Sequence, residues 1–172
     1  TEYVKELGAL NEVFGVLQLV SGDTRATFEN SITSSQFADR DEFITALIEK
    51  TSSVRELPNM REIERLWFEV QREMTEQGRV VKFNRSVKYP DGSEEIAEVT
   101  RVGIFNLVSK GKYLRWNGQL ETVAELSPQP AGRFQDSAAG LERTTSGFSE
   151  FGLDPSRGSI LELLIQVPSL RE

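Results

Sequence analysis

The sequence contains no cysteine and no histidine among its 172 residues. Without cysteine, the chain forms no disulfide, no iron–sulfur cluster and no thiolate zinc site. Without histidine, it lacks the usual general base and the commonest metal ligand, and a Ser-His-Asp triad is excluded. Glycine-rich phosphate loops and nucleophile-elbow motifs are also missing. We therefore expect a protein that is not an enzyme, with no catalytic residues, no cofactor and no metal.

Positive charge and long hydrophobic runs are scarce as well. Lys and Arg total 20 against 27 Asp and Glu, which gives a net charge of −7 and argues against a broad nucleic-acid-binding surface. The longest apolar run, residues 13–20, is far short of the roughly 20 residues that cross a bilayer. The chain begins with Thr1 and shows no signal-peptide pattern. We therefore expect it to be a piece of a longer protein.

Apolar residues recur at alternating steps of four and three near the N-terminus, which is the a/d pattern of a coiled coil. The ladder comprises Tyr3, Leu7, Leu10, Phe14, Leu17, Ser21, Thr24 and Phe28, and a second stripe comprises Val13, Val16 and Val20. This pattern predicts a coiled-coil-like helix in residues 1–34. A helix packed on its own domain is the alternative. For the coiled coil, the predicted partner-binding residues are Leu7, Leu10, Phe14 and Leu17.

A second amphipathic helix is predicted to begin near Asn59. Asn59 and Glu62 have the spacing of a capping box. Its apolar stripe comprises Ile63, Leu66, Trp67, Val70 and Met74. The opposite edge is charged and includes Glu69, Glu73 and Glu76. We expect the apolar stripe to pack inward and the charged edge to face water, with a partner surface on that edge as the alternative.

The middle of the chain, residues 79–125, alternates in the manner of β-strands. Pro90 and Gly92 predict a turn between the first two strands, and Asn117-Gly118 predicts a tight hairpin. Residues 96–108 read as one long strand, apolar on both faces in its second half. The segment therefore predicts a four-stranded antiparallel meander.

Two helices are predicted after the meander. The first is short and contains Phe134, Ala138 and Leu141. The second is apolar and ends at Pro168; its length does not separate a buried helix from a buried strand, but Asp154 as N-cap and the high leucine content favour a helix. The predicted fold class is therefore α+β, with N-terminal helices including the coiled-coil-like one, a central four-stranded antiparallel meander and C-terminal helices. The predicted division is residues 1–34 for the coiled-coil-like helix and 35–172 for an α+β domain.

Three stretches, residues 62–83, 101–114 and 153–172, resemble the periplasmic extension of TtpC-type proteins. The most specific parts of the resemblance are Leu66-Trp67-Phe68 and residues 154–158, Asp-Pro-Ser-Arg-Gly. Proteins of this family are TonB-system energisers in which a periplasmic region precedes a proton-channel domain of the MotA/TolQ/ExbB type.

The resemblance implies a periplasmic adaptor domain of an inner-membrane protein in a Gram-negative bacterium, within a complex that supports iron-siderophore uptake. The implied partners are ExbB/ExbD/TonB-type proteins and an outer-membrane component, with self-association through the first helix as a further expectation. The alternative is a periplasmic ligand-binding sensor domain, with a pocket near Trp67 and Trp116. An exposed apolar stripe on the first helix would favour the adaptor, whereas an enclosed pocket with convergent polar groups would favour the sensor.

Overall fold

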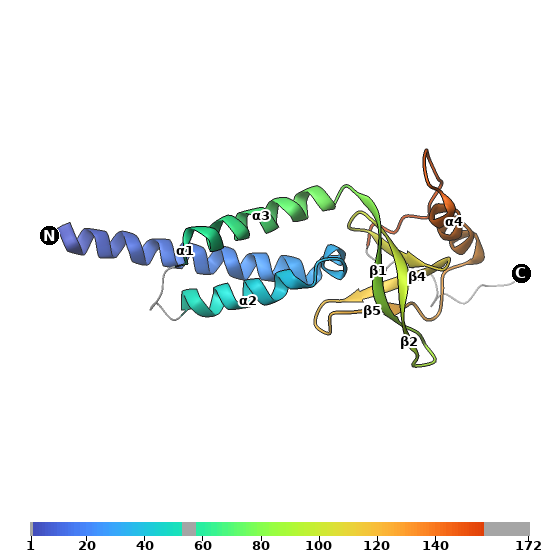
Figure 1. Cartoon of the computed structure of the whole chain (residues 1–172), viewed down its shortest axis with the longest axis horizontal. Coiled ribbons are helices and arrows are strands. Elements are labelled where there is room, and N and C mark those ends of the chain that lie inside the picture. Colours follow the sequence, from blue (N-terminus) through green and yellow to red (C-terminus); the bar gives the residue numbers. More distant parts are fainter. Residues whose placement is uncertain (1, 53–57, 157–172) are drawn as a thin grey trace, which may run out of the picture.

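The computed structural model describes residues 2–52 and 58–156 of the chain. Within these residues, a bundle of three helices lies beside a small β-barrel, and a fourth helix packs on the barrel (Figure 1). The helices are α1 (Glu2–Asn30), α2 (Asp39–Ser52), α3 (Met60–Glu76) and α4 (Gly132–Arg143), with a short 3-10 helix η1 (Ile32–Ser35) after α1. The strands are β1 (Val80–Lys88), β2 (Glu94–Val102), β3 (Asn106–Ser109), β4 (Lys112–Asn117) and β5 (Thr122–Glu125).

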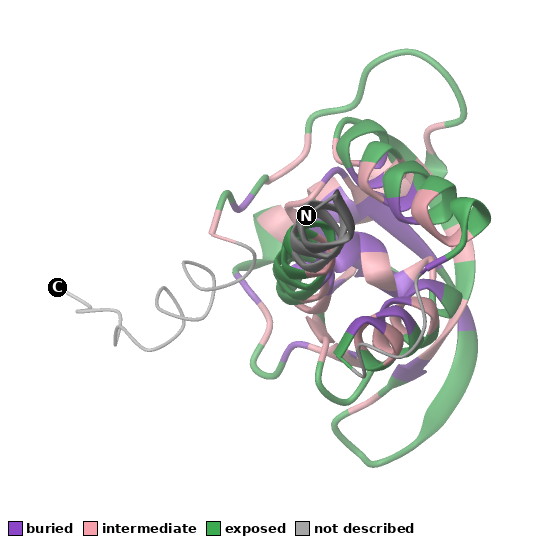
Figure 2. Cartoon of the chain, turned by 90° about the vertical axis from the view of Figure 1, so that its left-hand side faces the viewer, coloured by how far each residue is buried: buried purple, intermediate pink, exposed green. Residues whose placement is uncertain are grey.

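The bundle is held together by one hydrophobic cluster that draws on all three helices. Its buried members are Phe28, Ile44, Leu47 and Leu66. Helices α1 and α3 run in the same direction with α2 antiparallel to them, and the N-terminal part of α1 projects beyond the other two (Figure 1). Viewed from that free end, buried residues lie where the helices face one another and exposed residues lie on their outer sides (Figure 2).

The prediction of a coiled-coil helix in residues 1–34 is wrong for the part of α1 whose side chains are described. Ser21, Thr24 and Phe28, the last positions of the heptad ladder, are buried inside this chain's own bundle. The physical reason is that α2 turns back and covers this side of α1, so the alternative of a helix packed on its own domain holds here. Phe28, which precedes the predicted domain boundary at residue 34, packs in one cluster with Ile44, Leu47 and Leu66, which follow it. The division into two domains stays a prediction.

The five strands form a closed barrel with the order β1-β2-β3-β4-β5. Neighbouring strands are antiparallel, and parallel pairing of Val87 with Val123 and of Lys88 with Ala124 closes the barrel between β1 and β5. The predicted four-stranded antiparallel meander is therefore wrong, because it has one strand too few and no parallel closure.

The missed strand arises at Gly103, inside the segment predicted as one strand from residue 96 to 108. Gly103 has a φ of +57° and its N–H donates to the carbonyl oxygen of Arg79, 3.0 Å away. The amide of Phe105 donates to the Val102 carbonyl at 3.0 Å, which closes a tight turn. The chain therefore reverses there and splits the segment into β2 and β3.

We expect Gly103→Ala to lower the free energy of unfolding by about 1–3 kcal/mol, because a side chain at positive φ is strained. An added Cβ would also lie 2.6 Å from the carbonyl oxygen of Gln77. Urea denaturation measures the change. Gly92→Ala is the matched control, since Gly92 has a φ of +85° but open space around it. Equal losses in the two variants would show that the contact with Gln77 contributes nothing.

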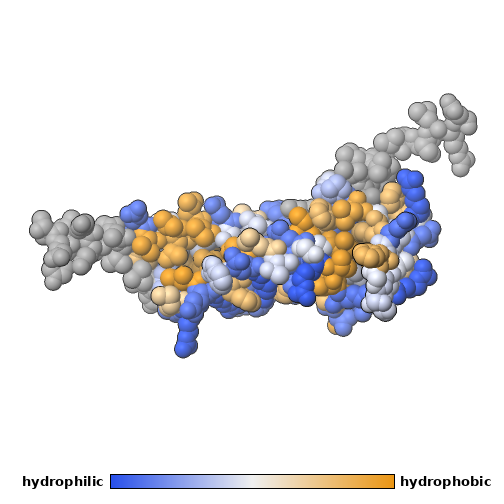
Figure 3. Space-filling view, turned by 90° about the horizontal axis from the view of Figure 1, so that it is seen from above, coloured by the Kyte–Doolittle hydropathy of each residue, from blue (hydrophilic) through white to orange (hydrophobic). Residues whose placement is uncertain are grey.

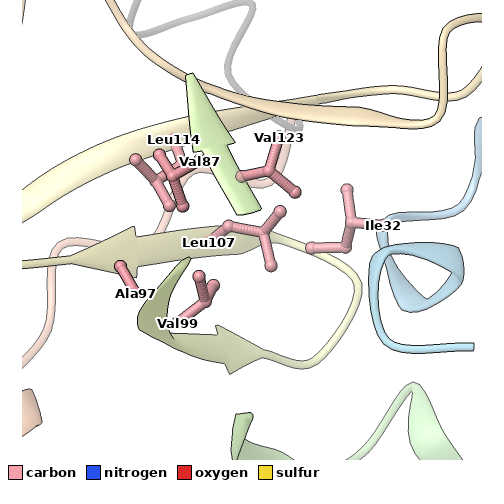
Figure 4. Close-up of a cluster of buried hydrophobic side chains, with 7 residues drawn as sticks. All are labelled: Ile32, Val87, Ala97, Val99, Leu107, Leu114 and Val123. Carbon is pink, nitrogen blue, oxygen red and sulfur yellow. The ribbon is translucent and has the colours of Figure 1, made fainter. Parts of the chain in front are cut away.

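The barrel interior is filled by aliphatic side chains from every strand and by Ile32 from outside the sheet. Ile32 of η1 points from the end of α1 into the cluster of barrel residues (Figure 4), which comprises Val87, Ala97, Val99, Leu107, Leu114 and Val123. The polar segment from residue 31 to 40 therefore joins the bundle to the barrel.

Helix α4 covers the outside of β3 and β4, where Ala138 packs with Val108 and Tyr113. This confirms the first predicted C-terminal helix. Among the described residues, which end at residue 156, α4 is the one α-helix after the barrel. Asp154 accepts a hydrogen bond from the Ser156 amide at 2.8 Å, and the second predicted helix lies outside the described residues.

Candidate functional site

Helix α3 packs with its acidic edge inward and its apolar stripe outward. Leu66 alone of the predicted apolar stripe is buried, whereas Trp67 is 66% exposed and Met74 63% exposed. Glu69, Glu73 and Glu76 are 2%, 4% and 7% exposed. The expectation that these glutamates face water is therefore wrong. An amphipathic helix normally buries its apolar side, so the inverted orientation needs a specific cause.

The first cause of this orientation is Glu73, because both of its carboxylate oxygens accept hydrogen bonds inside the protein. Arg40 Nη1 of α2 lies 2.7 Å from Glu73 Oε2, and the Arg40 side chain is wholly buried. The hydroxyl of Ser31 donates to Glu73 Oε1 at 2.5 Å, and the hydroxyl of Thr33 donates to Oε2. The Arg40 guanidinium also stacks over the Phe28 ring at 4.0 Å. A buried charge is tolerated when it is paired and hydrogen-bonded in this way.

Burial alone would raise the pKa of Glu73, but the hydrogen bonds from Ser31 and Thr33 and the charge of Arg40 outweigh it. The pKa of this carboxyl is therefore held below its ordinary value in the folded protein. Because the folded-state pKa is depressed, the stabilising contribution of Glu73 is fully present above the ordinary glutamate pKa of about 4.3. It is lost as the pH falls through the folded-state pKa.

We expect the stability difference between the unaltered chain and Glu73→Gln to be constant near neutral pH and to shrink as the solution is acidified below about pH 4.3. Urea denaturation of both chains across this range measures it. Both chains retain Glu69, so its contribution to the pH dependence cancels in the comparison. Burial raises the pKa of Glu69, so this contribution changes with pH in the direction opposite to that of Glu73. A difference independent of pH would contradict the Glu73 assignment.

The other two buried glutamates also face arginines. Glu76 Oε2 lies 2.6 Å from Nη2 of Arg101, a wholly buried side chain on β2. Glu69 Oε2 lies 2.5 Å from Nη2 of Arg72 on the same helix. Arg101 further donates to the backbone carbonyls of Glu76 and Gly103, at 2.7 and 2.9 Å. Pairs with α2 and with the barrel thus fix the rotation of α3 about its axis.

This rotation leaves an apolar face along α3 and α1. On α3, Met60, Trp67 and Met74 are exposed, and Ile63 and Val70 are half-buried. On α1, the exposed residues are Val13, Val16, Leu19 and Val20, at 49%, 55%, 65% and 41%. A groove separates the two helices and is lined by Val20, Asp23, Thr24, Thr27, Phe28, Val70, Glu73, Met74 and Gln77. In Figure 3, hydrophobic residues gather over the helical half of the molecule and again over the barrel half. The exposed and half-buried apolar residues of the two helices form what we call the α1/α3 face: Met60, Ile63, Trp67, Val70 and Met74 of α3, and Val13, Val16, Leu19 and Val20 of α1.

Only part of the predicted partner-binding set is described. Phe14 and Leu17 are half-buried, whereas the side chains of Leu7 and Leu10 lie outside the described part of the chain. Their role in partner binding stays a prediction. The second stripe, Val13, Val16 and Val20, is the more exposed one. The α3 contribution was missed. Its signal in the sequence is the spacing of Glu69, Glu73 and Glu76 along one edge, together with Arg101, a basic residue within the predicted strand from residue 96 to 108.

The sequence predicted a pocket near both Trp67 and Trp116, but the two side chains do not line a common pocket. Trp67 projects from α3, whereas Trp116 lies on β4 and packs against the barrel core. Trp116 borders a hollow at the end of α1 together with Glu29, Ile32 and Gly118.

The described residues offer no site for a bound metal ion. Within residues 2–52 and 58–156, no group of three acidic side chains is placed to hold a cation. In the same ranges, no helix is both long enough and apolar enough to span a membrane.

Comparisons with protein-family models, with curated proteins and with solved structures find no match to this chain.

Proposed function

We propose that this chain is a protein-interaction domain that binds its partner through the α1/α3 face. The observation that carries the proposal is the exposure of Val16, Leu19, Trp67 and Met74 on adjoining helices, while acidic residues of α3 are buried. Exposed contiguous apolar surface on a folded domain is typical of a binding site. The exposed apolar stripe on α1 supports the adaptor over the sensor.

We further propose that the partners are those implied by the sequence resemblance to TtpC-type proteins. The domain would then be the periplasmic adaptor of an inner-membrane protein and would assemble with ExbB/ExbD/TonB-type proteins to support iron-siderophore uptake. Its role is binding rather than catalysis. The resemblance supports the identity of these partners, and the α1/α3 face supports the binding role. The sensor alternative gains no support from Trp67, because its side chain is exposed and does not line an enclosed pocket.

Site-specific photo-cross-linking in cells that express the full-length parent tests this function. Photoreactive residues at Val16 and Met74 probe the α1/α3 face, and those at Ile96 and Leu120 are matched controls. The controls are exposed apolar residues of the barrel, at 78% and 69%. We expect adducts with TonB-system components from the first pair only. Adducts from the barrel positions alone, or from none of the four, would contradict the proposal.

A further inference from the structure

We infer that the α1/α3 groove binds one amphipathic helix of a partner protein, with basic residues beside its apolar stripe. This inference rests on the proposed interaction function and adds the chemistry of the occupant. Helices α1 and α3 run in the same direction, and Val20 of α1 lines the groove together with Val70 and Met74 of α3. A helix laid between them would complete a four-helix arrangement, which is the helix-in-groove mode of recognition.

The α1/α3 face, of which the groove is one part, is long enough for a helix of about four turns. From Val13 to Thr27 on α1, and from Met60 to Met74 on α3, each wall spans about 21 Å at 1.5 Å per residue. Both walls present residues at three- and four-residue spacing, which an occupant helix can match with a stripe of the same period.

Acidic residues lie in line with the apolar ones on both walls. On α1, positions 12, 16, 19 and 23 form one row, so Glu12 and Asp23 lie on either side of Val16 and Leu19. On α3, Glu64 occupies the row between Met60 and Trp67. All three carboxylates belong to exposed residues. The occupant therefore meets an apolar floor with negative charge along its edges.

Basic residues of α3 lie on a different edge. Positions 61, 65 and 72 follow a separate row. Arg65 stacks over Phe43 at 4.3 Å and Arg72 over Phe37 at 4.1 Å, so both are directed toward α2 and its preceding loop. On the described part of α1, Arg25 pairs with Glu29 at 2.9 Å, beyond the apolar stripe. The groove edges thus carry one sign of charge.

This distribution of charge favours a basic partner helix over a second copy of the chain. Two copies meeting through this face would bring identical acidic edges together, with a net charge of −7 on each chain. Like charges set against one another at an interface oppose binding, and opposite charges select the partner.

Two synthetic 18-residue helical peptides test the inference. Both carry the same leucine stripe, and they differ only in having lysine or glutamate at the flanking positions. Binding is followed by the fluorescence of Trp67 in a Trp116→Phe chain, since these are the two tryptophans of the sequence. We expect the lysine peptide to bind at least tenfold more tightly than the glutamate peptide.

Charge-reversal variants test whether the peptides bind at the acidic edges of the α1/α3 groove. Asp23→Lys with Glu64→Lys should weaken the lysine peptide about tenfold and strengthen the glutamate peptide. The matched control is Glu42→Lys with Glu49→Lys, which makes the same change of charge at exposed positions of α2 and should leave both affinities unchanged. Val16→Glu with Met74→Glu should abolish binding of the lysine peptide.

Equal binding of the two peptides, or equal effects of the two charge-reversal pairs, would overturn the inference. Absence of peptide binding together with self-association that Val16→Glu with Met74→Glu abolishes would show that a second copy is the occupant. The proposed interaction function would then survive and the inference would fail. If that double variant altered neither self-association nor cellular cross-linking, the proposed function would fail too.

Discussion

Replacing Arg40 by leucine is expected to lower the free energy of unfolding by about 3–5 kcal/mol, the usual cost of leaving a buried charge without its partner. Arg40 is wholly buried, and its guanidinium bonds Glu73 Oε2 at 2.7 Å and Thr33 Oγ1 at 2.7 Å. Its removal leaves the Glu73 carboxylate with hydroxyl donors and Gln77 but no positive charge. Urea denaturation followed by circular dichroism measures the loss.

Two further variants separate the charge from the packing. Arg40→Leu with Glu73→Leu removes both charges and should recover much of the stability, because replacing a whole buried pair by apolar residues is often neutral. Arg25→Leu breaks the exposed Arg25–Glu29 pair and should cost no more than about 0.5 kcal/mol. A loss for Arg40→Leu no larger than that for Arg25→Leu would contradict the buried network.

Replacing Arg101 by leucine is expected to have an effect of similar size, about 3–5 kcal/mol, and to uncouple the bundle from the barrel. Arg101 stands on β2 and binds the end of α3 through the carboxylate and the backbone carbonyl of Glu76, at 2.6 and 2.7 Å. It also donates to Gln36 Oε1 at 2.9 Å, just after η1. One side chain therefore joins the barrel to two segments of the helical half.

Single-tryptophan chains measure this uncoupling. Trp67 reports on the bundle and Trp116 on the barrel, so with Arg101 present both should change at the same urea concentration. In Arg101→Leu, the two transitions should separate. Arg79→Leu is the matched control, since Arg79 pairs with the same Glu76 at 2.9 Å but is largely exposed. Coincident transitions in Arg101→Leu would show that other contacts maintain the coupling.

Local features of the fold were predictable because their signals lie within a few residues of one another. The capping box of α3 is present as predicted, with Glu62 and Asn59 exchanging hydrogen bonds at 2.7 and 3.0 Å. The turn around Pro90 and Gly92 forms as expected, and the Tyr89 amide donates to the Ser93 carbonyl at 2.9 Å. Capping and turn chemistry depend on nearby residues alone.

Closure of the barrel was not predictable in the same way. The parallel pairing of Val87 with Val123 joins residues far apart in the sequence, and no local pattern specifies it. The turn at Gly103 did leave a signal, since an isolated glycine within a strand pattern marks a break or a close backbone approach. The hairpin at Asn117-Gly118 is wider than predicted, because the loop runs from residue 118 to 121 before β5 begins.

The orientation of α3 was the largest error concerning the candidate site. Apolar periodicity predicts which residues share a face of a helix but not whether that face is buried. Here Arg40 and Arg101 come from other elements and bury Glu73 and Glu76. Partners of this kind become visible only when the chain is folded. The sequence did show the exposed stripe on α1 as a second apolar row beside the heptad ladder.

Cysteine accessibility along α3 tests the central claim, that the apolar stripe of this helix faces outward. The chain has no cysteine, so single variants can be labelled without interference. We predict that Met74→Cys reacts with a thiol reagent about as fast as Thr75→Cys, an exposed reference, and that Leu66→Cys, at a 5% exposed position, reacts far more slowly. Protection of Met74→Cys equal to that of Leu66→Cys in the dilute, monomeric domain would contradict the account.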